Sequence, residues 1–94
     1  MESPSGHGDT SEQARLLERL RRGEAEAFDE LIGLAAGRML VLARRMLPSE
    51  ADAHDAVQDA FLNAFKSLDR FDGRAKLTTW LHQITVNACL MKLR

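Results

Sequence analysis

The sequence is poor in the residues that build disulfide frameworks, membrane spans and aromatic cores. Among its 94 residues are one cysteine, two prolines and no tyrosine, and aromatic residues make up 5%. A single thiol cannot form an internal disulfide or a cysteine-based metal cluster. No run approaches the roughly 18 apolar residues of a membrane span, and residues 1–9 lack the apolar stretch of a secretory signal. We therefore expect one small cytoplasmic domain with a modest core, preceded by a disordered tail over residues 1–10.

Charge is nearly balanced in total, with 13 basic and 14 acidic side chains, but it is unevenly distributed. Residues 49–65 contain four acidic side chains and no Lys or Arg, whereas residues 66–94 contain six basic and two acidic ones. An acidic block followed directly by a basic block predicts two different partners on adjacent surfaces.

Helical periodicity over residues 11–94 predicts an all-α fold, a compact bundle of about four helices. Thr10 and Gln13 have the spacing of a capping box at the start of the first helix, and Gly23 ends it. Apolar residues at three- and four-residue steps predict the second helix over residues 24–47, before Pro48.

The second half of the chain adds two more expected helices. Ser49 is a suitable cap for a third helix over residues 50–68, and a loop around Gly73 follows over residues 69–78. A fourth helix, capped by Thr78 or Thr79, is expected to run to the end of the chain. It carries two apolar arcs separated by a narrow polar stripe, which predicts a helix wedged between neighbours with the stripe exposed.

An acidic stripe on the third helix is the first candidate site. Asp52, Asp55 and Asp59 project to one side, with Gln58 and Leu62 beside them. The stripe is either a solvated helix face or a docking surface for a basic partner, and the apolar Leu62 among charges favours docking.

Catalytic and metal sites find little support in the sequence. His54 projects toward the apolar side of its helix and is expected to be structural, and neither it nor His82 has the Glu-x-x-His spacing of a di-metal bundle. Cys89 falls in an apolar arc, as a core thiol does, and no glycine-rich phosphate loop is present. We expect no enzyme, metal or cofactor.

The loop and the fourth helix are the second candidate site, a nucleic-acid surface. Basic side chains here suit phosphates, and Phe71 and Trp80 offer flat surfaces to an unstacked base, unless both rings only anchor the loop in the core. Gln83 and Asn87 carry the donors and acceptors that reading a base edge requires.

Two stretches resemble a known family. Asp-Ala-His-Asp-Ala-Val-Gln-Asp-Ala-Phe (52–61) resembles the polymerase-docking helix of region 2 in extracytoplasmic-function (ECF) sigma factors. Residues 68–87 resemble that family's DNA-melting loop and following helix, through the Arg-Phe-x-Gly step, the Thr-Trp-Leu triplet and an Asn seven residues beyond the Trp. Gly-Glu-x-x-Ala-Phe-x-x-Leu (23–31) also matches, so the resemblance covers roughly residues 12–94.

The resemblance implies a region 2 domain that docks on the β′ clamp helices of core RNA polymerase and recognises the promoter −10 element as single-stranded non-template DNA. It also implies an anti-sigma factor as partner, and a second domain for the −35 element that this chain lacks. No membrane or small-molecule partner is expected. An alternative is a sigma-like module that binds polymerase or a regulator without melting DNA.

The site residues that follow form two groups. The expected polymerase-binding residues are Asp52, Asp55, Gln58, Asp59 and Leu62. The expected DNA-binding residues are Lys66, Arg70, Phe71, Arg74, Lys76, Thr79, Trp80, Gln83 and Asn87. Because Asn63, Leu77 and Thr78 depart from residues common in the family, its base preference is not carried over.

Overall fold

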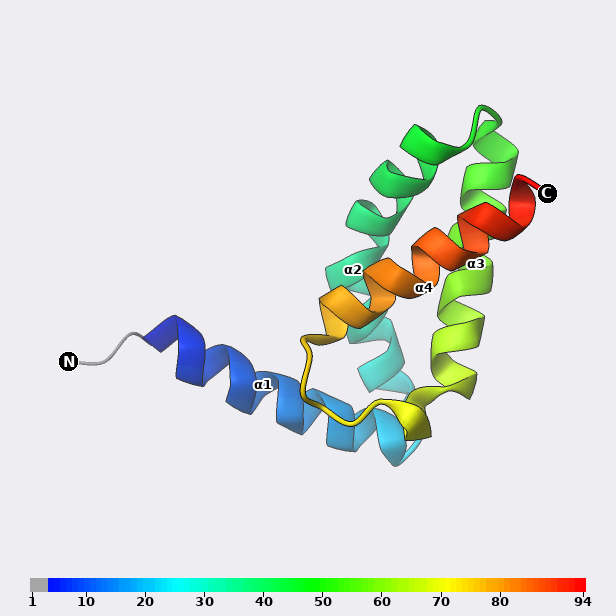
Figure 1. The fold of residues 1–94 in the computed structure, drawn as a ribbon. Coiled ribbons are helices and arrows are strands. Elements are labelled where there is room, and N and C mark those ends of the chain that lie inside the picture. The colour runs from blue at the N-terminus through cyan, green and yellow to red at the C-terminus, as the bar shows by residue number, and fades with distance from the viewer. Residues whose placement is uncertain (1–3) are drawn as a thin grey trace.

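The computed structural model describes the backbone of residues 4–94 and the side chains of residues 12–94. Its elements are helices α1 (Pro4–Arg21), α2 (Ala25–Met46), α3 (Glu50–Lys66) and α4 (Leu77–Lys92), with a 3-10 turn, η1 (Leu68–Arg70), between α3 and α4. Helices α2 and α3 run antiparallel, α4 crosses over both, and α1 extends away from one end of the pair (Figure 1). Residues 4–94 contain no strand, and the all-α prediction is confirmed.

Two helix ends follow from local sequence. Gly23 adopts φ +77°, and the amide groups of Gly23 and Glu24 donate to the carbonyls of Leu20 and Arg19 at 2.9 and 3.2 Å. This pair of bonds is a Schellman motif, which favours glycine because of its positive φ. Ser49 caps α3, since its hydroxyl oxygen accepts from the Asp52 amide at 3.2 Å. Both predicted ends are confirmed.

Two helix starts differ from the prediction. Helix α1 already begins at Pro4, so the helical backbone includes most of the expected tail, and residues 1–3 lie outside the described residues. Helix α4 begins at Leu77, and its N-cap is Lys76 and not Thr78 or Thr79. The Lys76 side chain makes no capping hydrogen bond. The acceptor comes instead from α1, where Gln13 Oε1 accepts from the Leu77 amide at 2.7 Å.

The core of the domain is built mainly from leucine and alanine, and alanine predominates on α3. On α3 the buried residues are Ala53, Ala56, Ala60, Phe61 and Ala64. Small side chains let α2 and α4 approach α3 closely. The contacts between these helices are therefore made by many atoms close to the backbone and by few large side chains. Leu16, Leu17 and Leu20 close the core from α1.

Helix α4 buries one side only, which corrects the prediction of two buried apolar arcs. Its buried residues include Leu81, Thr85 and Cys89, and the Thr85 hydroxyl donates to the Leu81 carbonyl at 2.7 Å. In contrast, Leu90, Met91 and Leu93 are 48%, 64% and 53% exposed. The helix lies on the α2–α3 pair instead of between neighbours (Figure 1), so part of each predicted arc is buried, while the apolar side chains at its C-terminal end stay uncovered. None of the helices over residues 4–94 combines the length and apolar character that crossing a membrane requires.

Candidate nucleic-acid interface and acidic patch

The two aromatic residues of the second candidate site pack on each other. The rings of Phe71 and Trp80 lie 4.9 Å apart between centroids, tilted by 37°. Phe71 is only 4% exposed, whereas Trp80 is partly buried. The prediction that the Phe71 ring offers a face to an unstacked base is therefore wrong in this structure, because the core covers it. Phe71 packs at the start of the loop against Trp80, which stays partly exposed.

The loop over residues 71–76 carries exposed basic side chains. Arg70, Arg74 and Lys76 are exposed, and the side chain of Arg74 is 90% exposed. The Asp72 carboxylate accepts from the Arg74 amide at 3.0 Å and turns the chain around Gly73, which adopts φ +86°. The loop thus presents its basic side chains next to a tight turn at Gly73. Lys66, at the end of α3, is exposed as well.

The outer face of α4 carries a row of polar side chains. Thr79, Gln83 and Asn87 lie one turn apart and all are exposed. Gln83 Nε2 donates to Asn87 Oδ1 at 3.3 Å, so the two side chains point to the same spot. This bond leaves the Gln83 carbonyl oxygen and the Asn87 amide nitrogen free for an external ligand. Gln83 and Asn87 belong to the predicted polar stripe of this helix, and their exposure agrees with it.

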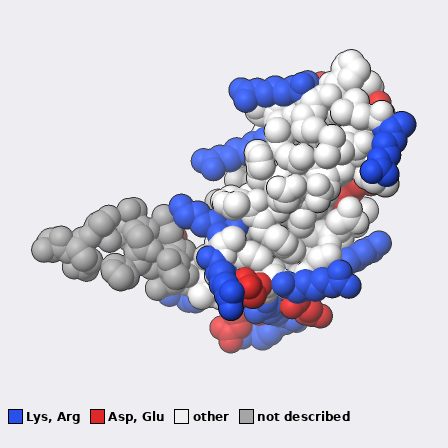
Figure 2. All heavy atoms as spheres, viewed as in Figure 1, with Lys and Arg blue, Asp and Glu red and all other residues white. Residues whose placement is uncertain are grey.

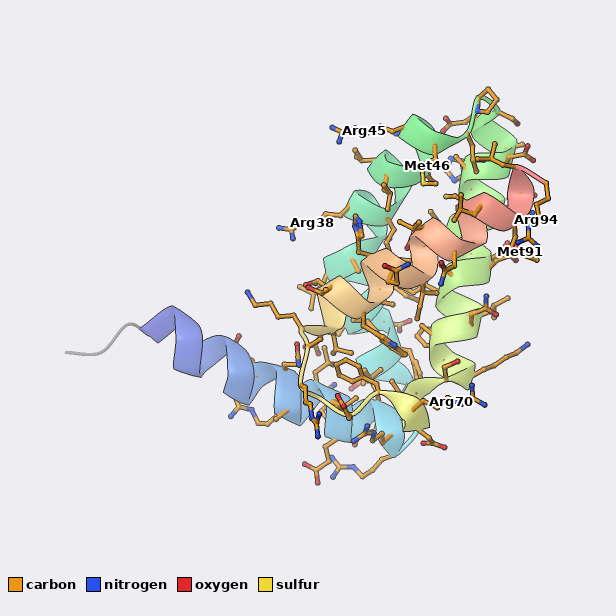
Figure 3. The ribbon with its side chains drawn as sticks, in the orientation of Figure 1. Arg38, Arg45, Met46, Arg70, Met91 and Arg94 are labelled. Atoms are coloured by element: carbon orange, nitrogen blue, oxygen red, sulfur yellow. The ribbon has the colours of Figure 1, made fainter. Side chains whose placement is uncertain are left out.

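Charge on this side of the molecule is arranged as a basic rim around an uncharged centre. Figure 2 shows uncharged atoms over α4, with Lys and Arg side chains around the edge and acidic side chains mainly at the bottom, beside basic ones. Arg38 and Arg45 project from α2 on one edge, Arg70 lies at the bottom, and Arg94 lies on the opposite edge (Figure 3). We call the outer face of α4, the loop and this rim the α4 face.

Arg38 and Arg45 were missed by the sequence reasoning. They lie two helical turns apart on α2, and neither forms an ion pair within the described side chains, whereas Arg44 pairs with Glu50 at 2.7 Å. Arg38 lines an open groove between α2 and α4, whose polar lining includes Thr78, Thr79 and His82. The seven-residue spacing of the two arginines was the available signal. Arg45 also lies in the last turn of the helix, where a basic residue is favourable for the helix dipole whether or not it binds a partner.

The acidic patch comprises Asp52, Asp55 and Asp59 of α3. Asp55 and Asp59 have side chains 60% and 53% exposed, and Asp52 is partly buried. Lys92 of α4 places its Nζ 3.9 Å from Asp55 Oδ2 and 3.6 Å from Asp59 Oδ2. The patch therefore has a cation beside it that no residue of the acidic block supplies.

The flanks of the patch match the prediction. Gln58 is exposed, and Leu62 is 52% exposed beside it. An exposed leucine among carboxylates gives a protein partner both a charged and an apolar contact. The acidic patch and the α4 face thus lie on different elements and carry opposite charge.

Two other predicted residues have opposite outcomes. His54 was expected on the apolar side, but its side chain is 58% exposed and its Nε2 lies 3.0 Å from Glu50 Oε2. The buried face of α3 is centred on alanines that leave His54 at its edge. Cys89 is fully buried, and burial raises the pKa of its thiol, as in an inert core cysteine. Across the described side chains, no group of three His, Cys, Asp or Glu residues is placed to hold a metal ion.

The domain is all-helical and carries a polar face with basic side chains at its edge and a separate acidic patch. Residues 31–94 match the model of the sigma-70 region 2 family, so the chain belongs to that family.

Several curated relatives are similar over most of the chain. The ECF RNA polymerase sigma factor SigM of Mycobacterium tuberculosis is 41% identical over 81 residues, 86% of this chain. The ECF sigma-E factor of Escherichia coli is 39% identical over 72 residues, 77% of this chain, and SigW of Bacillus subtilis is 30% identical over 78 residues, 83% of this chain. These matches span 41%, 37% and 42% of the relatives' own lengths. The relatives bear the names of transcription factors and not of enzymes.

A solved structure supports the fold. It is the NMR structure of an engineered region 2 of sigmaE in complex with GTAAAA, which is 38% identical to this chain with a TM-score of 0.76. The match covers 83% of this chain and 81% of the other.

Proposed function

We propose that this domain docks on core RNA polymerase through the acidic patch and captures the promoter −10 element as single-stranded non-template DNA on the α4 face. The observation that carries the proposal is the hydrogen-bonded Gln83–Asn87 pair, exposed on α4, the helix around which the basic side chains are arranged. The domain acts without catalytic residues, inside the cell where polymerase is found.

The α4 face suits a separated strand better than a closed duplex. Its centre offers amide groups to base edges, and Trp80 offers an aromatic edge beside them. Arg70, Arg74 and Lys76 supply phosphate contacts along the loop. Unstacking a base costs a few kcal/mol, which contacts to the exposed base and its phosphates offset.

The basic rim on α2 extends the same track. Arg38 and Arg45 are free of carboxylate partners among the described side chains, so their charge is available to phosphates. Each phosphate contact adds to the salt dependence of binding. The double change Arg38→Ala/Arg45→Ala is therefore expected to reduce the salt slope of single-stranded DNA binding by about 1.4.

Docking on polymerase is supported by a separate set of side chains. Asp55, Asp59 and Leu62 present two carboxylates and one apolar group outward from α3. A basic helical surface such as that of the β′ clamp helices is complementary to this patch. Because the patch and the α4 face do not share residues, polymerase and DNA can be bound together.

An alternative is a sigma-like interaction module that binds polymerase or an anti-sigma regulator without DNA melting. The exposed Leu90, Met91 and Leu93 at the end of α4 favour a protein partner in that region. The partner that we propose for this apolar end of α4 is an anti-sigma factor. Its binding would not involve the Gln83–Asn87 pair.

Strand opening on a promoter discriminates the two functions. Core polymerase with the wild-type domain is mixed with duplex promoter DNA carrying 2-aminopurine in its −10 element, and fluorescence reports unstacking. We expect a rise that Asn87→Ala diminishes while polymerase binding stays unchanged. Polymerase binding without opening on a library of promoters would favour the interaction module.

A further inference from the structure

Helix α1 contacts the loop over residues 71–76 through one stripe of side chains. Gln13, Leu17 and Arg21 lie four residues apart on α1, so they project on one side of the helix. Each contacts a different part of the segment from η1 to α4. The family-model match begins at residue 31, so these three residues lie outside it.

Gln13 holds the end of the loop. Its Nε2 donates to the Ala75 carbonyl at 3.0 Å, and its Oε1 accepts from the Leu77 amide at 2.7 Å. Leu77 is the first residue of α4, whose own N-cap side chain makes no hydrogen bond. One amide side chain from a distant helix therefore holds both the carbonyl of Ala75, next to the end of the loop, and the first amide of α4.

Arg21 holds the start of the loop. Its Nη2 donates to the carbonyl of Phe71, and it reaches the Leu68 carbonyl at 3.5 Å. These carbonyls belong to the 3-10 turn and to the first loop residue. A charged donor on a carbonyl makes a stronger hydrogen bond than a neutral one.

Leu17 lies beneath the middle of the loop. Its side chain is buried, and its Cδ2 lies 3.9 Å from the point that a β-carbon would occupy if residue 73 were not glycine. Between residues 72 and 75 the internal hydrogen bond of the loop is the one from the Arg74 amide to Asp72. The conformation of the loop thus depends on α1 at its start, middle and end.

We propose that the Gln13–Leu17–Arg21 stripe of α1 positions the loop for DNA, so that α1 sets DNA affinity without being a reading element itself. The inference rests on the proposed function of the α4 face. Freed from α1, the loop would sample conformations in which Arg74 and Lys76 do not line up with the Gln83–Asn87 pair. Apparent affinity then falls in proportion to the fraction of molecules that hold the competent conformation.

The test compares the full chain with Gln13→Ala/Arg21→Ala and with a charge-matched control, Arg15→Ala. Arg15 is an exposed residue of the same helix, and both variants lose one Arg and lower the net charge by one. Loop order is measured by ¹⁵N heteronuclear NOE over residues 71–77. DNA affinity is measured by fluorescence anisotropy with the single-stranded hexamer GTAAAA and with a pool of randomised single-stranded 12-mers.

We expect the stripe variant to lose loop order, to keep the NOE values of α2 and α3, and to bind single-stranded DNA about tenfold more weakly. The control should match the wild type. Unchanged loop order, or a released loop with unchanged DNA affinity, would overturn the inference. A wild-type chain that binds neither probe would instead overturn the proposed function. The two failures can be told apart, because the NOE measurement of loop order needs no DNA.

Discussion

Lys92, in the last turn of α4, places its ammonium nitrogen 3.6 Å from Oδ2 of Asp59 on α3. The same nitrogen lies 3.9 Å from Asp55, so one lysine balances two carboxylates of the acidic patch. In the isolated domain Lys92 occupies a position that the proposed basic partner would share.

Lys92→Ala is expected to strengthen binding to core RNA polymerase. The change removes a cation that repels a basic partner and leaves Asp55 and Asp59 free to pair with it. Because an exposed ion pair contributes about 0.2–1 kcal/mol, the gain should be about 1.5- to 5-fold and should shrink as salt is added. Biolayer interferometry at two ionic strengths measures it, with Arg15→Ala as a control of equal net charge. Weaker binding by Lys92→Ala would show that the lysine itself contacts the polymerase.

Asn87→Ala should weaken binding of single-stranded −10 DNA and leave polymerase binding unchanged. Asn87 is exposed and its side-chain oxygen accepts from Gln83, so the change removes both a base contact and the partner that orients Gln83. A bidentate base contact contributes about 1–3 kcal/mol, so affinity should fall about 5- to 150-fold. Met91→Ala, an exposed change on the same helix, serves as control. If Asn87→Ala left opening unchanged on every promoter tried, the assignment of the base contact would be wrong.

Ala60→Leu should destabilise the fold by about 1–3 kcal/mol, because Ala60 is fully buried on the core face of α3 and a leucine does not fit there without displacing a neighbour. Ala51→Leu, on the exposed side of α3, should change stability by less than about 0.5 kcal/mol. Urea denaturation followed by circular dichroism compares the two. Equal stability of both variants would mean that the alanine contacts are looser than described.

The Arg44–Glu50 pair at the turn between α2 and α3 should make stability pH-dependent. Hydrogen bonding by Arg44, with a smaller contribution from His54, holds the pKa of Glu50 below its ordinary value of 4.5. A carboxyl group whose pKa is lowered by folding stabilises the folded state above its ordinary pKa, and the effect is lost as pH falls through the lowered value. The Tm of Glu50→Gln should therefore lie below that of the wild type at pH 7 and converge with it in acid. A constant Tm difference from pH 7 to pH 2 would rule out this origin.

Local signals in the sequence predicted local structure well. Ser49 has a hydroxyl suited to a cap and Gly23 tolerates a positive φ, so each determines a helix end without help from distant residues. The apolar period over residues 24–47 likewise gave α2 to within one residue at each end. The family motifs indicated the polymerase and DNA partners, which no periodicity reveals.

Features that depend on partners far along the chain could not be predicted. Gln13 has the spacing of a capping-box residue, but its amide is bonded to residues 75 and 77, more than sixty positions away. Phe71 has an aromatic ring on which a base could stack, but the ring is buried in the folded domain and packs against Trp80. The prediction that His54 lies on the apolar side of its helix was wrong because it counted Val57 and Phe65 as the centre of that side. The buried side of α3 is instead formed mainly by alanines.

Binding of the purified domain to core RNA polymerase, beside the double variant Asp55→Arg/Asp59→Arg, tests the central claim most directly. Both aspartates are exposed on α3, so the variant should keep the helical circular dichroism spectrum and thermal unfolding of the wild type. The account predicts that the wild-type domain binds Escherichia coli core polymerase and that the variant loses at least about tenfold in affinity, since reversing two charges at an interface costs several kcal/mol. A well-folded wild-type domain that does not bind, or a variant that binds equally well, would contradict it.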